Sequence, residues 1–206
     1  MKPIVLFDID STLLNSAKIH LLTAGHLFRK LKIVLGRLAK RDWRGAWKLT
    51  LPDRQALGYL LLGRPQGFIR SSASRDSFLA PGYYRNALFE DVQPTLKKLR
   101  GKAYLGVFSQ GPVRLQHAKL HLSGIEKYFS PELIFIFPPR KVAKVKQIIA
   151  KLPKTKIYFI DDRPEIAATL SNHRVKVFLI RRNSHSAGKN GRVTIIRSLK
   201  EILDFV

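Results

Sequence analysis

Four of the fourteen acidic residues stand in two pairs, each directly after a short apolar run. Asp8 and Asp10 follow residues 4–7, and Asp161 and Asp162 follow residues 157–160. If the runs are strands of one parallel sheet, ligands bind beyond their carboxyl ends, and the two pairs meet there. Clustered carboxylates repel each other unless a cation joins them, and Mg²⁺ is the hard cation best suited to a phosphate substrate. The spacing therefore predicts a magnesium site.

Groups that suit a phosphate ester follow two further apolar runs. Ser109 and Gln110 come after residues 103–108 and offer a hydroxyl and backbone N–H groups at the start of a helix, where oxyanions bind readily. Lys141 comes after residues 133–137 and supplies a point charge for a phosphoryl oxygen. Lys144 and Lys146 lie on the same predicted helix, so the choice among the three lysines stays open.

The elements that carry these residues alternate regularly. The apolar runs predict strands, and amphipathic patterns of about ten residues between them predict helices. Such alternation indicates βαβ units, an α/β fold with a parallel sheet covered by helices on both faces. The predicted strands are residues 4–7, 103–108, 133–137, 157–160 and 175–180, and the predicted helices are residues 92–100, 112–122, 141–152 and 164–172. The Ser-, Gly- and Asn-rich segment 184–192 predicts a loop.

Residues 16–80 break this rhythm. Apolar residues recur there at helical spacing, and basic residues fill the opposite positions. A helical segment between the first strand and the remainder of a sheet is most simply an inserted cap. We therefore expect an α/β core of residues 1–15 and 81–206 and a helical cap of residues 16–80.

The charge of the chain is unusual. Lys and Arg number 38 against 14 acidic residues, which gives a formal net charge of +24 and a surface that attracts anions such as phosphorylated metabolites, nucleic acid or acidic membrane. No cysteine is present, which excludes thiol catalysis, Cys-ligated zinc and iron–sulfur clusters. No apolar run approaches the length of a membrane-spanning helix or a secretory signal, so a cytoplasmic location is expected.

Together the motifs resemble one family. FDIDSTLLNS is similar to motif I of the haloacid dehalogenase-like (HAD) hydrolase superfamily, DxDx[TV] after the first strand. FSQGP resembles motif II, Lys141 the motif III lysine, and YFIDDRPE the DD version of motif IV. Four motifs in the family's order, each after a predicted strand, form a specific match. The resemblance implies a Rossmann-like parallel sheet between helices, with a helical cap inserted after motif I.

The resemblance also implies phosphoryl transfer through an aspartyl phosphate. Asp8 would be the nucleophile, and Asp10 would protonate the leaving oxygen and then deprotonate water. Thr12, Ser109 and Gln110 would bind the phosphoryl group, and Lys141 would balance its charge. The Mg²⁺ ligands would be Asp8, the Asp10 backbone carbonyl, Asp162 and, either as a direct ligand or as a partner of one, Asp161.

An acid at the position of Asp10 argues against the dehalogenase branch, because a carbon–halogen bond needs no protonated leaving group. The resulting hypothesis is a Mg²⁺-dependent phosphomonoester hydrolase that acts on a small phosphorylated metabolite or nucleotide. Two alternatives remain: a phosphatase acting on nucleic-acid ends, and a non-catalytic HAD-like protein that binds nucleic acid or another anion. The sequence leaves open the substrate, the ligand of the basic cap and the oligomeric state.

Overall fold

The computed structural model describes residues 1–41, 81–137, 141–171, 175–182, 188–190 and 193–206. The chain divides into two compact units. The first unit combines Met1–Asn15 with Leu88–Val206, and the second unit is Ser16–Ala87. The sequence analysis expected a core of residues 1–15 and 81–206 and a cap of residues 16–80, and this assignment stays a prediction.

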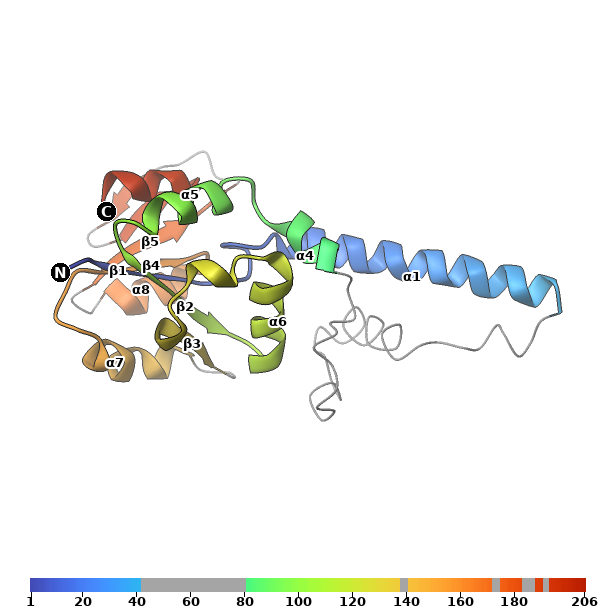
Figure 1. The fold of residues 1–206 in the computed structure, drawn as a ribbon, viewed down its shortest axis with the longest axis horizontal. Helices are drawn as coiled ribbons and strands as arrows, with labels where there is room; N and C mark the ends of the chain where they lie inside the picture. Colours follow the sequence, from blue (N-terminus) through green and yellow to red (C-terminus); the bar gives the residue numbers. More distant parts are fainter. Residues whose placement is uncertain (42–80, 138–140, 172–174, 183–187, 191–192) are drawn as a thin grey trace. The chain divides into compact units, whose positions relative to one another are not determined.

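A seven-stranded sheet forms the centre of the first unit (Figure 1). Its strand order is β3-β2-β1-β4-β5-β7-β6, and every neighbouring pair is parallel except β6 with β7. The predicted α/β fold with a parallel sheet is thus confirmed. The strands are β1 (Ile4–Phe7), β2 (Tyr104–Gln110), β3 (Ile134–Phe137), β4 (Ile157–Asp161), β5 (Lys176–Ile180), β6 (Gly188–Asn190) and β7 (Val193–Ile196).

The last two strands are missing from the sequence-based prediction. Residues 188–190 were expected to be part of a loop, but they pair antiparallel with β7, which itself extends the sheet beyond β5. Gly and Asn are poor strand formers, so local propensity argued against β6. The available edge of β7 supplies the hydrogen-bonding partner that the local sequence does not reveal.

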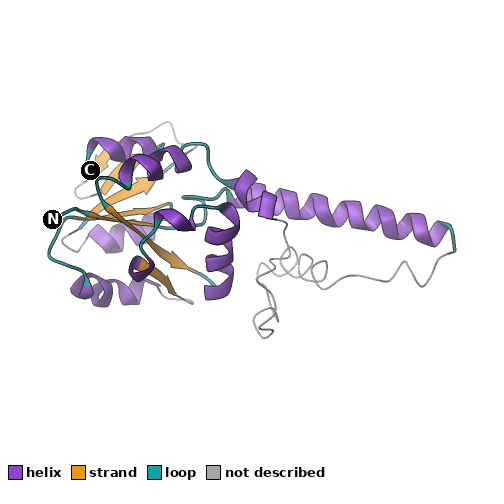
Figure 2. Cartoon of the chain, in the orientation of Figure 1, coloured by secondary structure: helices purple, strands orange, loops and turns teal. Residues whose placement is uncertain are grey.

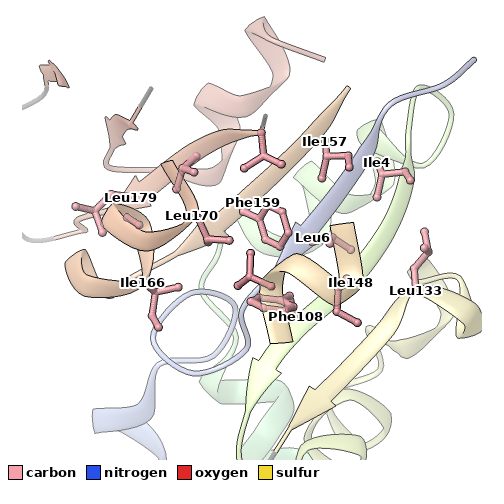
Figure 3. Packing of buried hydrophobic residues seen from close by; sticks show 14 residues of the cluster. Ile4, Leu6, Phe108, Leu133, Ile148, Ile157, Phe159, Ile166, Leu170 and Leu179 are labelled. Atoms are coloured by element: carbon pink, nitrogen blue, oxygen red, sulfur yellow. The ribbon is translucent and has the colours of Figure 1, made fainter. Parts of the chain in front are cut away.

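Helices cover both faces of the sheet (Figure 2). One face packs against α7 and α8, and the side chains between these layers form a continuous apolar cluster, including Leu6, Phe108 and Phe159 (Figure 3). These strand residues alternate with residues of the opposite face, as the pleat of a strand requires. The helices of this unit are α5 (Val92–Leu99), α6 (Val113–Ser123), α7 (Lys141–Lys151), α8 (Pro164–Ser171) and the 3-10 helices η1 (Glu126–Tyr128), η2 (Pro131–Leu133) and η3 (Leu199–Asp204).

The opposite face is closed by the C-terminal segment. The ring of Phe205 packs on Phe178 of β5, with centroids 5.0 Å apart, and its backbone carbonyl accepts a hydrogen bond of 2.9 Å from the Tyr158 hydroxyl. A capping box formed by Ser198 and Glu201 begins η3 and fixes the entry to this segment. The C-terminus of the chain is therefore part of the core packing.

The second unit contains two described helices, α1 (Ser16–Ala39) and α4 (Pro81–Ala87). Within this unit, Arg29 Nη2 donates a hydrogen bond of 2.9 Å to the Tyr83 hydroxyl. Helix α1 lies at the start of the predicted cap, whose residues 42–80 lie outside the described residues, so the helical cap stays a prediction. Among the helices that the structure describes, none has the length and apolar character needed to cross a bilayer.

Gly106 allows a close approach between β2 and its neighbours. A Cβ atom at this position would lie 2.5 Å from the Leu133 backbone oxygen and 2.6 Å from Leu6 Cδ2. Neither neighbour is a flexible surface group, because both residues belong to the buried apolar cluster. The sheet therefore requires glycine here to keep β1, β2 and η2 in contact.

We expect Gly106→Ala to lower the free energy of unfolding by about 2 kcal/mol or more, because the added methyl group overpacks the core. Urea denaturation followed by circular dichroism measures the loss. Gly101→Ala is the matched control: no atom lies within 4 Å of its added Cβ, and we expect a change of less than about 0.5 kcal/mol. Equal effects of the two substitutions would contradict the packing argument.

Candidate active site

The carboxyl end of β1 lies between the corresponding ends of β2 and β4. Phe7 is in register with Val107 on one side and with Ile160 on the other. The backbone N–H of Asp8 continues this pairing and donates to the Ile160 carbonyl over 2.9 Å. Asp8 is 4% exposed. The predicted nucleophile is therefore held by backbone pairing at the centre of the sheet edge.

The chain turns sharply after Asp8. The Ile9 carbonyl accepts hydrogen bonds from the N–H groups of both Leu13 and Leu14, each 3.0 Å long, and Ser11 takes a positive φ of 59°. Ile9, Leu13 and Leu14 are fully buried and anchor the loop in the core. The apolar residues of the motif thus fix a tight loop that presents Asp10 and Thr12.

Two buried hydroxyls at this end of the sheet lack hydrogen-bond partners. Thr12 Oγ1 in the loop after β1 and Ser109 Oγ in β2 neither donate to nor accept from any group in the described part of the chain. A buried polar group without a partner costs free energy, so such groups in a native fold usually mark a ligand or a water site. Both residues were predicted to bind phosphoryl oxygens, and their position and chemistry fit that role.

The second pair of acids ends β4, the neighbour of β1. Asp161 is buried, and its Oδ1 accepts a hydrogen bond of 3.0 Å from the backbone N–H of Arg163, which shapes the turn into α8. The Arg163 side chain lies 3.5 Å from the same oxygen. Asp162 is half-buried at the following position. The division of roles between these two acids at a metal stays a prediction.

The acids at the ends of β1 and β4 fit a magnesium ion. Among the described residues, no three Asp, Glu or His side chains gather closely enough to enclose a metal by themselves. Mg²⁺ does not require such a cage, because it usually keeps several waters and binds one or two carboxylates together with substrate phosphate. Carboxylates on two adjacent strand ends beside unpartnered hydroxyls match that mode of binding.

Asp10 makes contacts that the sequence analysis did not foresee. Lys119 Nζ on α6 lies 2.6 Å from Asp10 Oδ1 and 2.8 Å from Oδ2, and Gln116 Nε2 donates to Oδ2 over 2.9 Å. Lys119 is buried, at 4% exposure. The buried face of α6 carries Gln116, Lys119, Leu120 and Ser123, where a core helix usually carries apolar residues, and the sequence alone does not show which face of α6 is buried.

The structure gives less information on the predicted lysines and on Gln110. Lys141 is the first residue of α7, and its side chain lies outside the described part of the structure. Lys144 and Lys146 are exposed. Gln110 ends β2, and its carbonyl accepts a hydrogen bond of 3.1 Å from Gln116 Nε2. The roles of Lys141 and of the Gln110 side chain therefore stay predictions.

A buried ion pair supports the motif I loop from the opposite side. Arg182, which follows β5, donates through Nη1 to both carboxylate oxygens of Asp91 and through Nη2 to the Thr12 carbonyl over 2.8 Å. Asp91 also accepts from the Ser198 hydroxyl and the Leu199 N–H, each at 2.7 Å. The guanidinium lies 3.7 Å from the centroid of the Phe89 ring. This Asp91–Arg182 network fixes the backbone of Thr12.

Comparison with known proteins agrees with this geometry. No protein-family model and no curated protein sequence matches the chain. A magnesium-bound HAD-hydrolase of Bacillus subtilis matches with 16% identity, a TM-score of 0.62 and coverage of 99% of this chain and 98% of that chain. A HAD phosphatase of Thermococcus onnurineus matches with 20% identity, a TM-score of 0.60 and coverage of 100% and 97%. The chain has the HAD-like fold.

Dehalogenases share this HAD-like fold. The 2-haloacid dehalogenase of Pseudomonas syringae pv. Tomato DC3000 matches with 19% identity, a TM-score of 0.54 and coverage of 99% of this chain and 97% of that chain. At such identities the likeness establishes the fold and leaves the reaction to the site residues. The expected HAD-like architecture is confirmed, and any reaction has to be argued from this chain's own side chains.

The Asp91–Arg182 network makes stability depend on pH. Burial by itself raises the pKa of Asp91, but hydrogen bonds from Arg182, Ser198 and Leu199, with the charge of Arg182, outweigh it, so the net pKa lies below 3.8. Because the pKa is lower in the folded state, this stabilisation is complete above the unfolded-state pKa and is lost as pH falls through the folded-state pKa.

We expect Asp91→Asn to lower the free energy of unfolding by about 3 kcal/mol at neutral pH, since it leaves Arg182 buried without its anion. The difference in the free energy of unfolding between wild type and variant should become smaller as the pH falls below about 4. Urea denaturation across this pH range provides the measurement, with Asp204→Asn, an exposed carboxylate in η3, as the control. A difference in the free energy of unfolding that does not change with pH would contradict the lowered pKa of Asp91.

Proposed function

We propose that this protein is a Mg²⁺-dependent phosphomonoester hydrolase that forms an aspartyl phosphate on Asp8 and acts on a small phosphorylated metabolite or nucleotide. The observation that carries the proposal is the pair of buried, unpartnered hydroxyls of Thr12 and Ser109 at the strand ends beside the buried Asp8. Hydroxyl donors and a carboxylate nucleophile are the groups that a tetrahedral phosphoryl group requires.

In the first step, a carboxylate oxygen of Asp8 forms a bond to phosphorus as the bond from phosphorus to the ester oxygen breaks. The departing oxygen takes the proton of the Asp10 carboxylic acid, so that an alcohol leaves and Asp10 becomes a carboxylate. The products are the phosphorylated Asp8 and the free alcohol. The hydroxyls of Thr12 and Ser109 donate to the phosphoryl oxygens and hold the group in line with the nucleophile.

In the second step, water attacks the phosphorus of the aspartyl phosphate. The Asp10 carboxylate accepts a proton from this water, and the bond between phosphorus and the Asp8 oxygen breaks. Asp8 returns to a carboxylate, inorganic phosphate leaves, and Asp10 again carries the proton needed for the next cycle. Because Asp8 and Asp10 lie on one tight loop, both steps use groups with a fixed spacing.

The metal would be held by Asp8, the Asp10 backbone carbonyl, Asp162 and, directly or through Asp162, Asp161. When bound, Mg²⁺ offsets the negative charge of the carboxylates and of the phosphoryl oxygens. Lys141, at the start of α7, would add a positive charge near the same phosphoryl group. The magnesium-bound Bacillus subtilis HAD-hydrolase supports this expectation for the fold.

Asp10 favours phosphate esters over carbon–halogen bonds as the substrate class. A halide ion leaves without a proton, whereas an alcohol or a sugar hydroxyl is a poor leaving group unless it is protonated. Asp10 lies at the edge of the site with its side chain 36% exposed, where it can exchange a proton with a ligand. An acid in this place has a role in ester hydrolysis and none in dehalogenation.

The net charge of +24 favours a second candidate substrate, the phosphorylated end of a nucleic acid. Both candidates use the same chemistry at Asp8 and differ in how much of the substrate's charge the protein contacts. A non-catalytic, anion-binding role would use the same positive field and the same hydroxyls but would give the paired acids no function.

We expect the purified protein to hydrolyse 4-nitrophenyl phosphate with added Mg²⁺ and to lose this activity in EDTA. Asp8→Asn should lower kcat by at least about 10³-fold, because the covalent step loses its nucleophile. Release of 4-nitrophenolate measures the rate, and Asp204→Asn should retain wild-type activity. Activity that persists in EDTA or in Asp8→Asn, or turnover of a 2-haloacid instead, would refute the proposal.

Salt distinguishes the two substrate classes. On a polymer that contacts several phosphates, kcat/KM should fall about 10³-fold or more between 50 mM and 200 mM salt, whereas on a nucleoside monophosphate the fall should stay within about 10-fold. A panel of phosphorylated metabolites, nucleotides and oligonucleotides with 3′- or 5′-phosphates tests both. We expect kcat/KM to depend only weakly on salt. A steep fall of kcat/KM with salt, together with preferred turnover of oligonucleotides, would instead support the nucleic-acid substrate.

A further inference from the structure

We infer that Lys119 and Gln116 of α6 position Asp10 for proton transfer in this site. Helix α6 thereby contributes to protonation of the leaving group. The inference rests on the proposed function, since it concerns the same acid. Neither residue belongs to the four motifs that the sequence analysis identified. Both act through Asp10 and are therefore positioning residues, not catalytic ones.

The first observation is the burial of Lys119. Lysine is rarely fully buried unless its ammonium group has a partner, and Lys119 is only 4% exposed. Its Nζ contacts both carboxylate oxygens of Asp10, at 2.6 and 2.8 Å. Two contacts to one carboxylate restrict the rotation of the Asp10 side chain more than a single hydrogen bond would. A surface lysine that serves only solubility would point into solvent and not toward a carboxylate.

The second observation is that Gln116 holds the same carboxylate and is itself held. Its Nε2 donates to Asp10 Oδ2 over 2.9 Å and to the Gln110 carbonyl over 3.1 Å. Gln116 and Lys119 are three residues apart on α6 and so share one helix face. The end of β2, the start of α6 and the loop after β1 are thereby joined around one carboxylate.

The third observation is the space at Gly111. This residue has a φ of +157°, and an added Cβ would lie 2.5 Å from Gln116 Nε2. A larger residue would therefore displace the amide that contacts Asp10. Gly111 in the segment FSQGP thus leaves room for the Gln116 side chain, which extends to the loop after β1.

The contacts from Lys119 and Gln116 restrict where the Asp10 carboxylate can lie. Proton transfer requires the acid within hydrogen-bonding distance of the leaving oxygen, and a misplacement of about 1 Å can cost about 10²-fold in rate. The Asp10 side chain is partly exposed, and Lys119 makes two of the contacts that hold it in place. Removal of Lys119 should therefore impair the reaction according to how strongly the leaving group needs a proton.

The experiment compares two esters, phenyl phosphate and 4-nitrophenyl phosphate, with wild type and Lys119→Met. Phenolate is the poorer leaving group, and kcat/KM reports the steps through its departure. We expect Lys119→Met to lower kcat/KM about 100-fold for phenyl phosphate, the size of a general-acid contribution, and less than about 10-fold for 4-nitrophenyl phosphate. A purely structural role of Lys119 would lower both values equally.

Three further variants keep the test decisive. Lys119→Arg retains the charge and should recover most of the phenyl phosphate activity, while Gln116→Leu should show the same selective loss to a smaller degree. Lys98→Met, the same change at an exposed helical lysine of α5, should leave both esters unaffected. If Lys119→Met fails to fold, as judged by circular dichroism, then Gln116→Leu and Lys119→Arg decide the question.

The outcomes separate the two proposals. If the wild type hydrolyses neither ester with Mg²⁺, the proposed function fails and the inference with it. If the wild type hydrolyses both and the variants lose both equally, or lose neither, only the positioning role is overturned. A selective loss on phenyl phosphate that disappears in an Asp10→Asn background, where Lys119→Met has nothing left to position, establishes that Lys119 acts through Asp10.

Discussion

Backbone pairing of β1 with two parallel neighbours is the constraint on which the rest of the structure depends. Phe7, the last residue of β1, is in register with Val107 of β2 and with Ile160 of β4. Residues that follow these three positions are brought to the same edge of the sheet whatever their separation in the chain. Asp8, Ser109 and the acids after Ile160 owe their proximity to hydrogen bonds that involve none of their side chains. The backbone pairing that stabilises the fold therefore also positions the candidate site residues.

Two basic side chains contact the loop after β1, and each binds a different group of that loop. Arg182 and Lys119 contact this loop from two directions, the former through the Thr12 carbonyl and the latter through the Asp10 carboxylate. Arg182 also binds the Asp91 carboxylate and packs on the Phe89 ring, whereas the described contacts of Lys119 Nζ are with Asp10. One cation therefore stabilises the backbone of the loop, and the other contacts a group with a proposed chemical role. Most of the other basic residues described in α5 and α7 are exposed.

The sequence predicted the sheet well because buried parallel strands are continuous apolar runs. The five predicted strands and the four predicted helices of the α/β unit agree with the structure to within about two residues, the usual uncertainty of element ends. Strand β6 was missed because its Gly and Asn residues have no strand preference. The positions of Asp8 directly after β1 and of Asp161 at the end of β4 were predictable because the strands themselves are apolar runs, while the roles of both acids stay predictions. Lys119 and Gln116 were not predictable, because a polar residue in a helix can face solvent or a partner, and only tertiary contacts distinguish the two.

The order of the strands also has a consequence for how the chain reaches its folded state. Strand β1 is synthesised first, but its two neighbours, β2 and β4, follow only after the whole second unit has emerged. All four residues of β1 are buried in the final structure. Pairings this distant in sequence slow folding, and an unpaired apolar strand is prone to aggregation until its neighbours are made. A nascent chain of this protein therefore carries β1 without either of its sheet neighbours until β2 (Tyr104–Gln110) has been made, and without the second until β4 (Ile157–Asp161) follows.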